Sequence, residues 1–155
     1  MKINGFSLRD HLRLLAPLFG IIAAVWALRL ILAAMGASRV ALSVCSVTTA
    51  SAVTLLLAVL LIHGRHLGGY ANVVAAVFLL ECWEQGLIGA AIAFGALTGT
   101  QNVYSAPEFS FGLSPLRHIL GHLTFGIGLG TLFGSATGCL LLWLLRKFVP
   151  ARAGR

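Results

Sequence analysis

Charged residues are scarce in this sequence, and acidic residues are the scarcest of all. Only 4 of the 155 residues are Asp or Glu, and charged residues of both signs make up 10% of the chain, against about 25% in an average soluble domain. Hydrophobic residues make up 59%, and the mean hydropathy is +0.96. This composition argues against a water-soluble globular domain and indicates a membrane domain.

Sequence motifs of common enzymes and cofactor-binding proteins are missing as well. The chain contains no Walker loop, no GxSxG, no HExxH and no dinucleotide-binding fingerprint. Cys45, Cys82 and Cys139 form no CxxC pair, which argues against a thiol–disulfide exchanger and for small core residues. We therefore expect a non-enzymatic protein. No particular cofactor is implied, and we identify no resemblance to a known family.

Long apolar stretches dominate what is present. Four of them, at about 14–36, 40–62, 72–97 and 116–145, reach the roughly 20 residues that a helix needs to cross a bilayer. Their apolar residues do not alternate with polar ones, as the strands of a membrane barrel would require. The sequence therefore predicts an all-α integral membrane protein, a bundle of four transmembrane helices that forms a single domain over residues 1–155.

The basic residues predict how this bundle is oriented. Two of them, Arg39 and Arg117, lie on one side of the predicted spans, and eight lie on the other: Lys2, Arg9, Arg13, Arg65, Arg146, Lys147, Arg152 and Arg155. The positive-inside rule then places both termini in the cytoplasm, and we expect a bacterial cytoplasmic (inner) membrane. The formal net charge of +7 fits contact with lipid headgroups better than nucleic-acid binding, because the basic residues are scattered over short segments.

Glycine recurs at every fourth residue of the last span. Gly126, Gly130, Gly134 and Gly138, here called the glycine ridge, fall on one face of a helix and let another backbone approach closely. The partner helix could belong to a second copy of the chain or to the same chain, and the sequence leaves both alternatives open.

Three charged residues interrupt the apolar spans. Arg29, Glu81 and Glu84 are costly at such depth and normally face protein or water. Counting along the helices places Arg29 and Glu84 at similar depth, which predicts an ion pair between spans one and three. Glu81, one turn from Glu84, fits either a structural role or a proton or cation site. Polar residues at similar depth could complete a layer with them: Gln85, Thr48 and Thr49.

Histidines and a long loop are the remaining polar features. His63 with His66 and His118 with His122 form two pairs that the predicted topology separates by most of the bilayer. His118 and His122 share a helix face, which suits a ligand or a metal, but two side chains rarely suffice for a metal, so we favour interfacial histidines without a ligand. The outer loop, 98–115, is either a lid or a flap at headgroup depth; its marked residues are Tyr104, Pro107, Glu108, Phe109, Phe111 and Pro115.

Three functions fit these patterns. We favour a small protein that assembles through the glycine ridge, as a homo-oligomer or as a subunit of a larger membrane complex. The first alternative is a small proton- or ion-coupled transporter or channel that uses Arg29, Glu81 and Glu84. The second is a protein that binds a lipid-soluble ligand or cofactor through His118, His122 and the outer loop. The expected partners are the lipid bilayer and other membrane subunits.

Overall fold

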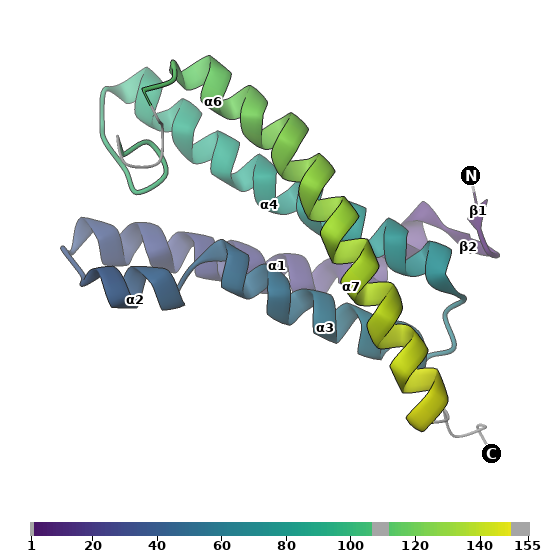
Figure 1. The fold of residues 1–155 in the computed structure, drawn as a ribbon. Coiled ribbons are helices and arrows are strands. Elements are labelled where there is room, and N and C mark those ends of the chain that lie inside the picture. The colour runs from purple at the N-terminus through teal and green to yellow at the C-terminus, as the bar shows by residue number, and fades with distance from the viewer. Residues whose placement is uncertain (1, 107–111, 150–155) are drawn as a thin grey trace.

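The computed structural model describes residues 2–106 and 112–149. Four of its helical segments are long and apolar enough to cross a membrane: Leu8–Ala34, Arg39–Gly64, Tyr70–Thr98 and Pro115–Phe148 (Figure 1). The prediction of four such helices is therefore confirmed. The elements in chain order are β1 (Lys2–Ile3), β2 (Phe6–Ser7), α1 (Leu8–Ala34), α2 (Arg39–Val44), α3 (Val47–Gly64), α4 (Tyr70–Thr98), α6 (Pro115–Gly121), the π-helical turn η1 (His122–Gly126) and α7 (Ile127–Phe148).

A small hairpin precedes α1 and was not foreseen from the sequence. Its strands β1 and β2 pair antiparallel across Asn4 and Gly5, whose φ angles of +46° and +88° fit the left-handed turn that Asn-Gly favours. The helix then begins with a capping box: Ser7 Oγ accepts from the Asp10 N–H at 3.3 Å, and the Asp10 carboxylate accepts from the Ser7 N–H at 2.8 Å. These two bonds satisfy backbone donors at the helix start, so α1 begins at Leu8, before the predicted span.

The second apolar segment is interrupted, whereas the sequence predicted one unbroken span over 40–62. α2 ends at Val44, and α3 begins at Val47. Ser46 caps α3 by accepting a hydrogen bond from the Thr49 N–H at 3.1 Å. A serine side chain that bonds a backbone group in this way competes with continuation of the helix, so the break turns α2 away from α3 at one end of the bundle.

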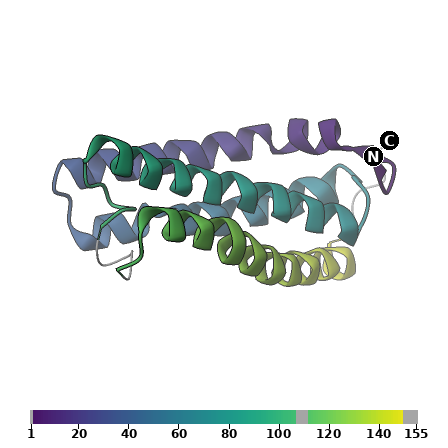
Figure 2. The ribbon, with the colours of Figure 1, turned by 90° about the horizontal axis from the view of Figure 1, so that it is seen from above.

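The helices run roughly antiparallel along one long axis, and α6–η1–α7 crosses the others obliquely (Figures 1 and 2). The first and last described residues, at β1 and just after α7, lie at one end, here called the end with the termini, and α2, the end of α4 and the start of α6 lie at the opposite end. The larger apolar core contains Leu15, Ile22, Ile62, Val73 and Leu142, all at most 1% exposed. The smaller core, toward the α2–α6 end, contains Val47, Ile88, Ala91, Ile92 and Tyr104.

The glycine ridge faces α4 of the same chain along its whole length. A Cβ added at Gly134 would lie 2.8 Å from Val77 Cγ1, and one added at Gly138 would lie 2.8 Å from Val73 Cγ1. Gly126 faces Gln85 in the same way, and Gly130 faces Glu81. Of the two alternatives that the sequence left open, the structure shows packing within the chain, with glycines that make room for side chains of α4.

We predict that Gly134→Ala lowers the free energy of unfolding by about 1–3 kcal/mol, because its new methyl group overpacks against Val77. Gly128→Ala is the matched control. Gly128 lies on the same helix with no atom within 4 Å of an added Cβ, so this change should be neutral or stabilising by up to about 1 kcal/mol. The measurement is unfolding of the purified protein by titration with dodecyl sulfate in a mild detergent. Equal effects of the two substitutions would show that the ridge is not tightly packed.

Candidate functional site

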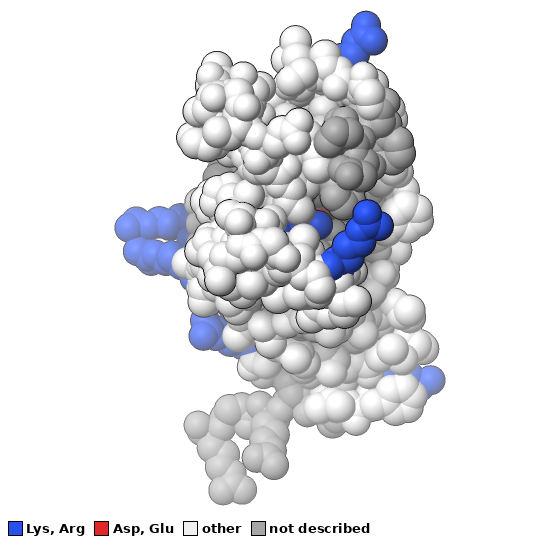
Figure 3. Space-filling model, turned by 90° about the vertical axis from the view of Figure 1, so that its left-hand side faces the viewer, with Lys and Arg blue, Asp and Glu red and all other residues white. Residues whose placement is uncertain are grey.

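A large cavity opens between two groups of helices at the end of the bundle away from the termini. Its volume is about 660 Å³, and it lies between α1, α2 and α3 on one side and α4, α6 and η1 on the other. Figure 3 looks onto this end: most of the surface in view is uncharged, a few lysine or arginine side chains project from the outline, and acidic atoms scarcely show. The cavity is lined by Arg29, Arg39, Leu42, Ser43, Ser46, Val47, Thr48, Ile88, Val103, Tyr104, Ala106, His118 and His122.

Arg29 and Tyr104 form the most polar part of this lining. The Arg29 guanidinium carbon lies 5.1 Å from the centroid of the Tyr104 ring, within the range of a cation–π contact. Arg29 Nε and Tyr104 Oη are both buried, and neither has a hydrogen-bond partner in the described part of the chain. Burial raises the pKa of the Tyr104 phenol, although Arg29 opposes this shift. The phenol is therefore a proton donor at neutral pH.

The second histidine pair, His118 and His122, is held in position by a hydrogen bond to α4. The rings of His118 and His122 lie 5.0 Å apart, and His118 is 9% exposed. His122 Nδ1 donates to Gln85 Oε1 at 2.7 Å. A neutral His122 then carries its lone pair on Nε2, the nitrogen that remains to contact a ligand. His122 also starts the π-helical turn η1, a feature that occurs frequently at functional sites.

Arg29 does not take Glu84 as its partner, so the predicted ion pair between spans one and three is wrong. Glu84, only 4% exposed, accepts a short hydrogen bond from Ser51 Oγ of α3. The long Arg29 side chain contacts Tyr104 in the loop after α4 instead. The flexible stem of arginine lets its charged group lie well away from the depth of its own Cα, which depth counting ignored.

Glu81 lies apart from the cavity, in the space that Gly130 leaves between α4 and α7. Neither Glu81 nor Glu84 lines the cavity, whereas Arg29 does. The three polar residues expected to form a layer with them lie in different places. Gln85 accepts a hydrogen bond from His122, and Thr48 lines the cavity. The hydroxyls of Thr49 and Ser46 form a hydrogen bond of 2.9 Å. Of these three charged residues, only Arg29 therefore lines this cavity.

The loop after α4 is folded onto that helix and positions Tyr104. Asn102 Nδ2 donates to Ala91 O at 2.8 Å, and Asn102 Oδ1 accepts from the Tyr104 N–H at 2.9 Å. Gly95 permits this approach, because an added Cβ would lie 2.8 Å from Thr100 O. Tyr104 is consequently 6% exposed and packs against the smaller core, and its placement at headgroup depth stays a prediction. The other marked residues of the loop from Pro107 to Phe111 lie outside the described residues.

The first histidine pair lies at the opposite end of the bundle. His63 Nε2 donates to Val149 O at 2.8 Å, and His66 is exposed in the turn before α4. No group of three or more His, Cys, Asp or Glu side chains that could hold a metal ion occurs within residues 2–106 and 112–149. We therefore propose no metal site at the described histidines.

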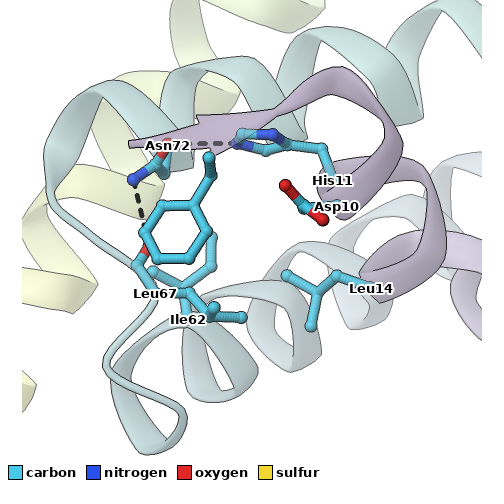
Figure 4. A pocket seen from close by; sticks show the side chains of 7 residues that line it. Asp10, His11, Leu14, Ile62, Leu67 and Asn72 are labelled. Atoms are coloured by element: carbon cyan, nitrogen blue, oxygen red, sulfur yellow. Dashed lines mark hydrogen bonds between the residues drawn. The ribbon is translucent and has the colours of Figure 1, made fainter. Parts of the chain in front are cut away.

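His11, the histidine that the sequence analysis passed over, is buried near the termini. Its Nδ1 lies 2.9 Å from Ser7 O, and its Nε2 lies 3.1 Å from Asn72 Oδ1, while Asn72 Nδ2 donates to Leu67 O at 3.0 Å (Figure 4). Both contacts of the ring are acceptors, so the imidazolium form satisfies them together. The adjoining space is only about 20 Å³, which makes this cluster a structural tie between α1 and α4 and leaves no room for a ligand.

Gln85 connects the glycine ridge to the cavity, because it lies against Gly126 and bonds His122 of the cavity lining. A Cβ at Gly126 would lie 2.6 Å from Gln85 Oε1, so Gly126→Ala should displace the amide and break its bond to His122. We expect the His122 ring to lose its Nδ1–H tautomer, as measured by ¹⁵N NMR of protein labelled at histidine. Gly121→Ala is the control, because no atom lies within 4 Å of its added Cβ. An unchanged tautomer in the Gly126 variant would contradict the arrangement.

Comparison with protein-family models, with curated proteins and with solved structures finds no match for this chain. The function is therefore argued from the geometry of the chain itself. Its clearest feature is a large, mostly apolar cavity with two arginines and two histidines in its lining.

Proposed function

We propose that this protein is a small, non-enzymatic membrane protein that binds a lipid-soluble ligand in the cavity at the α2–α6 end of its bundle. The observation that carries the proposal is the cavity of about 660 Å³ lined by apolar side chains together with Arg29, Tyr104, His118 and His122. Ligand sites typically occupy about 300–1,000 Å³ and combine an apolar lining with a few polar groups. Both properties are present here.

Placement in a membrane is part of the proposal. The four long helices expose many large apolar side chains, among them Phe125, Phe133 and Leu132, each more than 60% exposed. Such a surface is stable against lipid tails and costly in water. Because most basic residues lie at the end with the termini, the positive-inside rule places that end in the cytoplasm and the cavity on the outer side. A ligand would then enter from the outer leaflet or from the outer aqueous phase.

The other two functions have less support from the geometry. Assembly through the glycine ridge would require a second chain on a face that α4 already covers. A coupled ion path would require Glu81 and Glu84 to share a route with Arg29, but only Arg29 lines the cavity. Oligomers that form through other faces of the bundle remain compatible with ligand binding.

Native mass spectrometry of the protein, released gently from membranes, tests ligand binding. We expect the wild-type protein to retain an added mass that is lost on stronger activation. His118→Ala/His122→Ala should reduce the retained fraction at least about tenfold, because both polar groups of this wall are removed. His63→Ala, at the opposite end of the bundle, should retain the mass. A bare wild-type protein, or equal retention in the double variant, would contradict the proposal.

Reporter fusions test the orientation. Alkaline phosphatase fused after Arg155 should be inactive, and green fluorescent protein fused there should fluoresce, because both report a cytoplasmic C terminus. Phosphatase inserted at Gly36, in the turn between α1 and α2 where φ is +72°, should be active. The opposite pattern of activities would reverse the orientation and place the cavity on the cytoplasmic side.

A further inference from the structure

The cavity contains more positive charge than its own residues neutralise. Arg29 and Arg39 are both in its lining, and no acidic side chain is among the described residues that line it. A cation inside an apolar bundle is costly unless a counter-charge or water accompanies it. Glu84 does not line the cavity, and its carboxylate accepts a hydrogen bond from Ser51. Among the residues that the structure describes, no carboxylate belongs to this lining, and an anionic ligand would supply the counter-charge.

Two buried donors are positioned to receive that charge. Arg29 Nε and Tyr104 Oη are buried and each lack a hydrogen-bond partner within the described residues, which is costly for a polar group. The two residues belong to the lining of the same cavity, and the guanidinium carbon lies 5.1 Å from the Tyr104 ring centroid. Tyr104 is held there by the loop bonds of Asn102 and is 6% exposed. An anion in this cavity would lie next to both side chains, and their rotation toward it would let it accept hydrogen bonds from the guanidinium and the phenol.

The remaining lining shows what else the ligand must contain. Val47 and Ile88 belong to the buried apolar core that adjoins Tyr104, and Leu42, Val103 and Ala106 extend this apolar wall. An inorganic anion would leave most of this wall in contact with water. An apolar chain attached to the anion would cover it, at about 25 cal/mol per Å² of apolar surface buried.

We infer that the cavity binds the acidic headgroup of an amphiphile, a carboxylate or a phosphate monoester on an apolar chain, between Arg29 and Tyr104. This inference rests on the proposed ligand-binding function and names the class of ligand for that same cavity. Arg39, exposed at the mouth, attracts the anion, while Arg29 and Tyr104 fix its position. A planar guanidinium pairs with either headgroup in a bidentate manner.

The test compares four probes with the protein in phosphatidylcholine nanodiscs, using empty nanodiscs as the blank. The probes are dodecanoic acid, dodecyl phosphate, dodecan-1-ol and inorganic phosphate. At least one of the two acidic amphiphiles should bind at least about tenfold more tightly than the alcohol, because a hydrogen bond to a charged group contributes more than one to a neutral group. Which of the two binds more tightly distinguishes a carboxylate ligand from a phosphate ligand. Inorganic phosphate should bind weakly, because it has no apolar chain.

Variants of the two donors complete the experiment. Arg29→Gln should abolish the preference for acid over alcohol, and Tyr104→Phe should reduce it several-fold while the ring remains in place. Arg29→Lys keeps the charge but not the fork of donors, so it should bind the acid with intermediate affinity. Arg146→Gln removes one positive charge at the opposite end and should leave all four affinities unchanged. Thermal unfolding of each variant shows that the bundle still folds.

The outcomes separate this inference from the proposed function. Equal binding of acid and alcohol would overturn the acidic-headgroup inference and leave a neutral ligand site. Binding of inorganic phosphate as tight as that of the amphiphiles would also overturn it, because the apolar wall would then contribute nothing. If no probe binds and the native protein retains no added mass, the proposed function itself is wrong. A loss of the preference in Arg146→Gln equal to that in Arg29→Gln would place the acid on the outer surface of the protein and contradict the site.

Discussion

Four glycines on one face of the η1–α7 segment let it approach α4 closely, and the polar interior of the bundle depends on this approach. The backbone of α7 lies where Cβ atoms at Gly134 and Gly138 would collide with Val77 and Val73. Helices in lipid gain little from hydrophobic association, so close van der Waals packing of this kind is a principal source of their stability. The same contact leaves space for Glu81 and Gln85 between the helices. It thereby connects the packing of the core to the wall of the cavity at the α2–α6 end, because Gln85 in turn bonds His122.

The buried charges are accommodated separately and not as a network. Glu84 is paired with the Ser51 hydroxyl, Glu81 lies against the glycine ridge, and Arg29 contacts the face of the Tyr104 ring. A carboxylate bonded to one hydroxyl and an arginine over one aromatic ring are each only partly compensated. For Arg29 this incomplete compensation coincides with a cavity. A cation beside open space, with no carboxylate partner among the described residues, is the arrangement on which the proposed ligand binding rests.

The two ends of the bundle differ in how completely their polar groups are satisfied. At the end with the termini, hydrogen bonds connect neighbouring segments. They are the capping box of α1, the His11–Asn72 bond, the bond from Arg146 to Gly68 O and the bond from His63 to Val149 O. At the α2–α6 end, the broken second segment and the cavity leave Arg29 Nε and Tyr104 Oη without partners in the described residues. Packed, fully bonded regions resist opening, whereas binding sites draw on less completely satisfied ones. The asymmetry supports a closed structural end and a ligand-binding end.

The sequence by itself determined the number of long apolar helices and the spacing of the glycine ridge, because these follow from local composition and helical periodicity. Only the tertiary structure decided which helix the ridge faces, since Gly130 has no side chain whose chemistry could indicate Glu81 as its neighbour. It also decided that Arg29 contacts Tyr104 in place of Glu84, because the reach of a long side chain and the path of the outer loop cannot be read from depth along a helix. The break at Ser46 and the roles of Gly95 and Asn102 were missed for a related reason. Whether a single serine, glycine or asparagine caps a helix, allows a close approach or bonds a loop depends on the backbone groups that the fold brings close to it.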